Sequence, residues 1–185
     1  MKKDFGVKPW LCPQTVSIIA TFDRDGNADA MNAAWCGMFD DDLVELCLSA
    51  THKTTANIKE TKAFTVSAAD AAHVKECDYL GCVSGNKESD KLTKAGFTVT
   101  KSRFVNAPVI NELPFVLECE LVRFTEEGTV IGRIVNAAVD ESVLSSDGKV
   151  DLAKFRPIVF DPFTNCYRVV GEKVGEAFHD GLALR

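Results

Sequence analysis

Residues 49–58 of the chain, SATHKTTANI, have the composition of a helix start that could bind an anion. An apolar strand pattern ends before them and a helix pattern follows, which leaves the first amide N–H groups of the helix unpaired at the positive end of its dipole. His52 and Lys53 add side-chain donors, and the Thr54 hydroxyl either caps the helix or faces a ligand. Taken alone, the pattern also describes an ordinary capped helix, so other parts of the chain must distinguish the two.

The overall charge excludes one class of anionic ligand. The chain of 185 residues contains 21 Lys and Arg against 27 Asp and Glu, a formal net charge of −6. Duplex nucleic acid requires a broad basic surface, which this balance opposes, whereas a local basic pocket is compatible with it. The length predicts a single domain over residues 1–185.

The cysteines and the apolar segments predict the cellular setting. No apolar segment follows the basic residues at the N-terminus, and no window approaches 18 consecutive apolar residues. The seven cysteines lie mostly inside apolar runs, as small buried hydrophobic residues do. His73, Cys77 and Cys82 do not complete a four-ligand set, and no CxxC occurs. We therefore expect a soluble, cytoplasmic protein in a reduced compartment, without a metal site.

Alternating apolar residues and turn signals predict a mainly β protein with short helices. The Asp-Gly pair in residues 23–27, DRDGN, indicates a tight hairpin turn. Residues 81–90 read as a loop in which Asp90 caps the next helix, and Gly96 ends that helix. The predicted strands are residues 15–22, 28–35, 43–49, 63–68, 97–100, 114–125 and 130–139, with a further segment at Val109 and Ile110. The predicted helices are residues 55–61, 71–80, 91–95 and 151–155.

The order of these elements indicates the fold class. Hairpins and meanders with a few inserted helices favour a closed antiparallel barrel over a parallel sheet, which would need strictly alternating strands and helices. The chain contains no GxGxxG and no GxxxxGK[ST] motif. A dinucleotide fold of the Rossmann type and a P-loop are therefore not predicted.

Four segments, taken together, resemble the flavin reductase-like family with an FMN-binding split barrel, which includes the flavoredoxins. The resemblance extends over most of the chain and rests on the joint order of the segments, since each is weak alone. It implies a Greek-key split β-barrel, a homodimer, and one FMN bound near the subunit interface of each protomer. The segments are residues 25–27 with 32–35, residues 51–61 with 64–67, residues 78–85 with 90–91, and residues 107–110 with 117–119.

The resemblance assigns the helix start at residues 49–58 to the phosphate of FMN. Charge-assisted hydrogen bonds from His52, Lys53 and Thr54, together with the following N–H groups, would hold the phosphate. Ser49 and Thr51 add hydroxyl donors. The alternative for His52 is that it only orients the turn, and the alternative for Lys53 is a solvated charge beside a plain cap.

The segment Asn32, Ala33, Ala34 and Trp35 is assigned to the edge of the flavin ring. Small alanines let the backbone approach closely, so that backbone N–H groups bond the ring nitrogen N5 and the carbonyl edge. The alternative is an ordinary strand with Trp35 in the core.

Four further residues complete the predicted cofactor site. Ser84 and Gly85 would close over the ribityl chain or the ring, with a plain surface turn as the alternative. Lys91 matches the family pattern and equally reads as a solvated charge. Phe163 would cover a flavin face in a partner subunit, although a late aromatic residue is more often in a core.

The function predicted from this resemblance is an FMN-binding oxidoreductase of the flavin reductase or flavoredoxin type. Hydride or electrons would pass through bound FMN, from NAD(P)H or a redox protein to an acceptor. No side chain needs to act as an acid or base, so we predict no catalytic residue. Two alternatives stay open: an FMN electron-transfer carrier with little NAD(P)H activity, and a non-catalytic small-molecule binding barrel. Cys36, Cys82 and Cys166 are interpreted as buried or incidental thiols.

Overall fold

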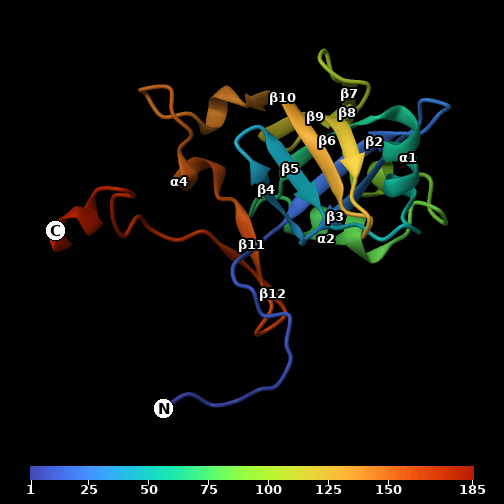
Figure 1. Cartoon of the computed structure of the whole chain (residues 1–185). Helices are drawn as coiled ribbons and strands as arrows, with labels where there is room; N and C mark the ends of the chain where they lie inside the picture. The colour runs from blue at the N-terminus through green and yellow to red at the C-terminus, as the bar shows by residue number, and fades with distance from the viewer.

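A curled, seven-stranded antiparallel sheet forms the centre of the computed structural model, which describes residues 1–185 (Figure 1). Every pair of neighbouring strands in it is antiparallel, as the hairpin pattern predicts. In order across the sheet, the strands are β3 (Ala28–Ala33), β2 (Ser17–Phe22), β6 (Ala63–Ala68), β9 (Phe115–Phe124), β10 (Val130–Val139), β5 (Leu43–Leu46) and β4 (Cys36–Asp40).

The β2–β3 hairpin confirms the turn predicted from Asp-Gly. The carboxylate of Asp23 accepts hydrogen bonds from the backbone N–H groups of Asp25 and Asn27, at 3.0 and 2.9 Å. Gly26 has a φ of +82°, a conformation that costs little only in glycine. The turn therefore sets the register that pairs Ser17 with Ala33 at the far end of the hairpin.

The sheet is a split barrel, because its two end strands do not pair. Strands β3 and β4 are the two end strands of the sheet, although only Ala34 and Trp35 separate them in the sequence. Strand β4 turns away from β3 and pairs with β5 at the other end of the sheet. A fully closed barrel, as the strand pattern alone suggested, is therefore wrong, and the split form implied by the family resemblance is confirmed.

Two apolar cores cover the two faces of the sheet. Ile18 and Ile19 are adjacent in β2 and both fully buried, one in each core, because successive strand side chains point to opposite faces. Inside the curl, Phe64 packs directly against Gly132 of β10, where a Cβ would lie 2.2 Å from the ring. Full burial of a Phe or Ile side chain stabilises the fold by about 1.5–3 kcal/mol.

The helices are short: α2 (Val74–Cys82) and α3 (Lys91–Lys94) contribute to the core outside the curl, whereas Ile58 of α1 (Lys53–Thr61) is buried in the core inside it. Helix α1 starts two residues before the predicted range of residues 55–61. Compared with the predicted range of residues 71–80, helix α2 is shifted towards the C-terminus of the chain. The shift of α2 arises because Asp70 accepts hydrogen bonds from the N–H groups of Ala72 and His73, which forms a turn before the helix. The helices are α1 (Lys53–Thr61), α2 (Val74–Cys82), α3 (Lys91–Lys94) and α4 (Leu152–Phe155), with 3-10 turns η1 (Glu141–Val143) and η2 (Asp180–Leu184).

Two smaller sheets complete the fold. The pattern did not predict β4, β11 (Ile158–Asp161) or β12 (Cys166–Val169), which are short. Strand β11 pairs with β1 (Gln14–Thr15) on one side and with β12 on the other, and β7 (Val99–Lys101) pairs with β8 (Pro108–Ile110). Both chain ends extend away from the barrel beyond this three-stranded sheet (Figure 1). None of the helices has the length and apolar character needed to cross a bilayer.

Candidate functional site

The start of α1 leaves three backbone donors without an intrahelical partner. His52 precedes the helix in an extended conformation and makes no side-chain cap bond. The first bond of the helix runs from Ala56 N–H to the His52 carbonyl, at 3.2 Å. The N–H groups of Lys53, Thr54 and Thr55 therefore have no acceptor within the helix, at its positive end.

Four segments distant in sequence meet around this helix start. The cavity there has a volume of about 230 Å³. It brings together six of the predicted site residues: His52, Lys53, Thr54, Ser84, Gly85 and Lys91. Strand β3 forms a further wall with Asp29, a residue that the sequence did not single out.

Asp29 is the central side chain of the cavity. Its carboxylate accepts a 2.8 Å hydrogen bond from the Thr54 hydroxyl and lies 3.4 Å from the Lys91 ammonium. The Asp29 and Lys91 side chains are each only 3% exposed, so they form a buried ion pair. Gly85 lies against the same carboxylate, because a Cβ there would fall 2.2 Å from Asp29 Oδ1. One carboxylate thus holds β3, α1, α3 and the loop after α2 together.

Two sequence-based interpretations of this region are corrected. Thr54 is not a helix cap: it lies inside the first turn, and its hydroxyl donates to Asp29. Lys91 is not a solvated charge, because it is buried against that same carboxylate. Asp90 does occupy the position before α3, but its side chain makes no cap bond and instead lies 3.3 Å from Lys94 Nζ.

His52 and Lys53 are the side chains that remain available to a ligand. His52 Nδ1 is buried and has no hydrogen-bond partner. Lys53 Nζ lies 3.6 Å from the Asp23 carboxylate, a long and partly exposed ion pair. Burial alone would raise the pKa of Asp23, but hydrogen bonds from Asn27 and Asp25 and the charge of Lys53 hold that pKa below its ordinary value.

The neighbouring turn and loop carry further predicted donors. Ser49 and Thr51 are exposed and share a 2.9 Å hydrogen bond between their hydroxyl oxygens. The side-chain amide of Asn86 donates to the Thr51 carbonyl at 3.1 Å, which ties the loop after α2 to the turn before α1. Ser84 is exposed and accepts from the Asn86 N–H at 3.3 Å.

The segment predicted to contact a ring lies at the end of β3, outside this cavity. Asn32 Nδ2 donates to the Cys77 carbonyl of α2 at 3.2 Å, and Ala33 is buried. Ala34 and Trp35 follow the strand and line a separate hollow on the β4 side. Trp35 is 58% exposed, so it is not a core residue.

Phe163 lies far along the chain, in the turn between β11 and β12. Its ring is exposed and packs edge-on against Trp10, with 5.4 Å between ring centroids. It is therefore not part of the core. The structure does not bring it to the cavity at α1.

Comparison with known proteins gives the family. The model of the flavin reductase like domain matches residues 11–160. The chain belongs to the flavin reductase-like family.

Solved structures agree with this assignment. A flavoredoxin of Desulfovibrio vulgaris (Miyazaki F) is 35% identical, covers 98% of this chain and 100% of its own, and superposes with a TM-score of 0.94. A flavoredoxin from Methanosarcina acetivorans is 27% identical over 100% of both chains, with a TM-score of 0.90. The FMN-binding domain of a flavin reductases-like enzyme from Shewanella baltica shares the fold at 18% identity, with 88% of this chain and 89% of its own covered and a TM-score of 0.78.

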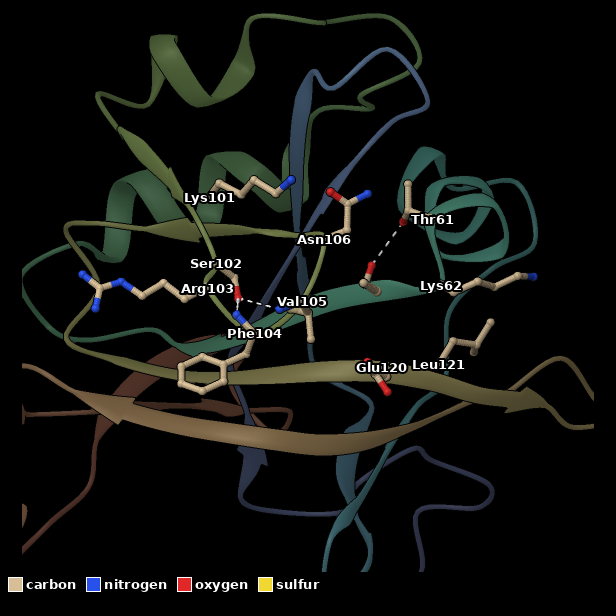
Figure 2. A pocket seen from close by; sticks show the side chains of 11 residues that line it. Thr61, Lys62, Lys101, Ser102, Arg103, Phe104, Val105, Asn106, Glu120 and Leu121 are labelled. Carbon is tan, nitrogen blue, oxygen red and sulfur yellow. Dashed lines mark hydrogen bonds between the residues drawn. The ribbon is translucent and has the colours of Figure 1, made fainter.

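A second cavity of this flavin reductase-like protein lies away from the helix start. It has a volume of about 500 Å³ and lies at the C-terminal end of α1, between Lys62 and the loop after β7. Figure 2 shows that the Lys62 and Arg103 side chains extend in opposite directions, and Glu120 adds a negative charge. Lys62 and Arg103 therefore do not converge on a common anion site.

The thiols of this family member form no disulfide, and three of them are largely buried. All seven cysteines are free. Burial raises the pKa of Cys36, Cys77 and Cys119 to about 12, which keeps these thiols protonated. Cys82 is exposed rather than buried, and the nearby Asp78 carboxylate raises the pKa of its thiol. No group of three or more His, Cys, Asp or Glu side chains is placed to hold a metal ion.

Proposed function

We propose that this protein is an FMN-binding oxidoreductase of the flavin reductase or flavoredoxin type. It would pass hydride or electrons through bound FMN, from NAD(P)H or a redox protein to an acceptor. The observation that carries the proposal is the cavity at the start of α1, which is lined by His52, Lys53 and Thr54 and lies beside three unpaired amides and a buried, unpaired His52 nitrogen. The likeness to a flavoredoxin at 35% identity supports it.

The donors present fit a phosphate group. A phosphate monoester carries a charge of about −1.5 to −2 and has three acceptor oxygens. The amides of Lys53, Thr54 and Thr55 can donate to it at the positive end of α1. His52 Nδ1 would gain the partner that it lacks, if its tautomer places the proton there. Lys53 can exchange its long contact with Asp23 for a charge-assisted bond to the ligand.

The charge of the cavity explains why Lys53, rather than Lys91, is the phosphate contact that we propose. Lys91 is buried and already neutralised by Asp29, so its ammonium would have to break a buried ion pair to move. Lys53 is more exposed, and its partner Asp23 is held by its own turn. Asp29 and Lys91 therefore position the walls, and Lys53 meets the anion.

The size of the cavity indicates which part of FMN it takes. Its volume of about 230 Å³ is below the roughly 300–1,000 Å³ of pockets that enclose a drug-sized ligand. The phosphate and ribityl end would lie inside. The ring would lie outside, along the backbone of residues 32–35.

When bound, FMN supplies the redox chemistry, accepting hydride or electrons at its ring. The role of the chain is to bind, orient and shield. Backbone N–H groups near Ala33 and Ala34 would orient the ring edge, and Asn32 would keep this segment against α2 through its bond to Cys77. We propose that a second copy of the chain, in a homodimer, shields the exposed ring side, with Phe163 of the second copy as the candidate cover.

A carrier function is the second candidate. The segment of residues 32–35 lies at the open edge between β3 and β4, where Trp35 is largely exposed. A ring lying there could be reached by another protein as well as by a nicotinamide. Access for a partner protein is what a carrier needs, so a carrier with little NAD(P)H activity is the alternative.

The decisive experiment begins with the absorption spectrum of the purified protein. We expect a yellow protein with a flavin spectrum, or uptake of added FMN by the apoprotein. Anaerobic mixing with NADH and with NADPH then separates the two candidates: rapid bleaching of the flavin indicates a reductase, and very slow bleaching indicates the carrier. A colourless protein that does not take up FMN would overturn both.

A further inference from the structure

The C-terminal tail, residues 171–185, makes no hydrogen bond to the rest of its own chain. The last backbone bond that ties the C-terminal region to the body runs from Val170 N–H to the Pro157 carbonyl, at 3.0 Å. All later hydrogen bonds and ion pairs join residues within the tail. Figure 1 shows the tail leading away from the barrel.

The tail nevertheless has a defined shape that presents apolar side chains. Asp180 Oδ2 accepts from the Glu176 N–H at 2.9 Å, and the 3-10 turn η2 follows. Phe178, which lies between Glu176 and Asp180, is 100% exposed, and Val174 and Leu184 are 95% and 93% exposed. The backbone of Phe178 has a φ of +62°, a conformation that is costly for a bulky residue unless other contacts compensate. The hydrogen bonds of its own turn hold this backbone, but the exposed ring packs against nothing in its own chain.

An apolar groove begins where the tail leaves the body. It has a volume of about 340 Å³ between β4, β5, β6 and β11, and Val170 is part of its wall. Its walls include Met38, which is 57% exposed, and the buried Val44 and Leu46. Ser67 also lines it, and its hydroxyl is buried without a hydrogen-bond partner. An entering peptide segment would cover the apolar walls and could also satisfy this hydroxyl, because its backbone carries N–H and C=O groups.

We propose that the tail of each chain docks in the apolar groove of a second copy of the chain. The tail of each chain begins at Val170, on the rim of the groove of the same chain. In a two-fold symmetric dimer whose two grooves face each other near the axis, each tail therefore starts at the mouth of the groove of the other chain. Phe178 would be the anchor, and the groove would be filled reciprocally.

The comparisons place this segment outside the general family domain. The family match ends at residue 160. The flavoredoxin of Desulfovibrio vulgaris (Miyazaki F), in contrast, covers 98% of the chain at a TM-score of 0.94, so it has a similar segment. The exchange would therefore be a feature of the flavoredoxin-like subgroup. It deepens the homodimer included in the proposed function and does not depend on flavin binding.

The first test is the mass of the full-length protein in solution, measured by light scattering across a dilution series. We expect twice the chain mass of 20.2 kDa. Phe178→Asp should weaken the dimer about 30-fold or more, as expected for loss of a buried aromatic anchor. Met38→Arg, in the groove, should have a similar effect. Phe104→Asp is the control. Phe104 is 58% exposed, close to the 57% of Met38, but lies at the distant cavity of Figure 2, so the dimer should be unchanged.

The second test locates the contact directly. A photoreactive benzophenone amino acid replaces Phe178 in chains of natural isotopic abundance. These chains are mixed with nitrogen-15 labelled chains and irradiated. The cross-linked peptides are then identified by mass spectrometry. We expect cross-links between differently labelled chains, to peptides of residues 36–46 or 157–170. Cross-links only within one chain, or an unchanged dimer in both Phe178→Asp and Met38→Arg, would overturn the proposal.

The flavin spectrum separates this inference from the proposed function. A monomer that binds FMN would overturn the tail exchange and leave FMN binding intact. A colourless dimer with cross-linked tails would overturn FMN binding and leave the tail exchange intact.

Discussion

The two ends of the proposed cofactor site differ in how completely one chain builds them. The phosphate end at α1 is enclosed by four segments held together by the buried carboxylate of Asp29. The ring end at residues 32–35 lies on the open edge of the split barrel, beside an exposed Trp35. A single protomer can therefore be selective for a phosphate, whereas shielding of the ring requires something more.

Two aspartates organise their surroundings over different distances in sequence: Asp29 at the phosphate end, and Asp161 in the hairpin between β11 and β12 that carries Phe163. Asp29 bonds Thr54 and contacts Lys91, which are remote in the chain. Asp161 accepts instead from Phe163 N–H at 2.8 Å and from the Thr164 hydroxyl at 2.9 Å, within its own turn. Loss of Asp29 should therefore affect the whole fold, and loss of Asp161 only the hairpin that carries Phe163.

The largest effect is expected from Asp29→Ala. It leaves the buried Lys91 ammonium without its counter-ion, which should lower the free energy of unfolding by about 3–5 kcal/mol. Urea denaturation measures this change. Asp25→Ala is the control, because Asp25 pairs with Arg24 on the surface and should change stability by less than about 1 kcal/mol. Equal effects of the two substitutions would show that the Asp29 carboxylate does not hold the segments around the cavity together.

Gly85→Ala should have the next largest effect. The added methyl group meets Asp29 Oδ1, which cannot move freely while it is paired with Lys91 and Thr54. We expect a loss of about 1–3 kcal/mol in unfolding free energy and weaker FMN binding. Unchanged FMN affinity in Gly85→Ala would mean that the ligand does not approach this loop.

Lys53→Ala tests the selectivity of the phosphate end. Loss of one charge-assisted bond should weaken FMN about tenfold, near 1.4 kcal/mol, and leave riboflavin within about twofold because riboflavin has no phosphate. Lys59→Ala on the same helix is the control, since Lys59 lies over the Phe124 ring at the other end of α1. Fluorescence titration with both flavins gives the two ratios. A parallel loss for FMN and riboflavin would argue against phosphate binding at Lys53.

The smallest effect is expected in the hairpin that carries Phe163, from the pH dependence of Asp161. Hydrogen bonds from Arg168 and Thr164 lower the pKa of this carboxyl to about 2, below its ordinary value near 3.9 in an unfolded chain. Its stabilising contribution is thus complete above about pH 4 and disappears as the pH falls through about 2.

The difference in melting temperature between the wild type and Asp161→Asn should therefore shrink between pH 5 and pH 2. The difference should be small throughout, because Arg168 is largely exposed. A difference that stays constant over this range would contradict the assigned pKa.

Local patterns in the sequence were enough to predict much of the fold. The hairpin at Gly26 and the strand Ala63–Ala68 follow from turn chemistry and from β-branched and aromatic residues acting over a few positions. The short strands β4, β11 and β12 were missed, because they are defined by pairing with distant strands rather than by their own periodicity. Of the site, the helix start at residues 52–54 was recognisable from residue type alone.

The role of Asp29 could not be predicted in this way. Its partner Thr54 lies 25 positions further along the chain, and its partner Lys91 lies further still. Only the folded barrel brings the three residues together. The one available signal was a charged residue in the otherwise uncharged strand ADAMNA. The same limit explains why Thr54 was interpreted as a cap: its true acceptor lies on another element.

A crystal structure of the protein with FMN would show directly where the phosphate binds. We expect phosphate oxygens within about 2.7–3.2 Å of the amide nitrogens of Thr54 and Thr55 and of Lys53 Nζ, with the ring outside the cavity along residues 32–35. A phosphate bound elsewhere, for example between Lys62 and Arg103 at the cavity of Figure 2, would contradict this phosphate assignment.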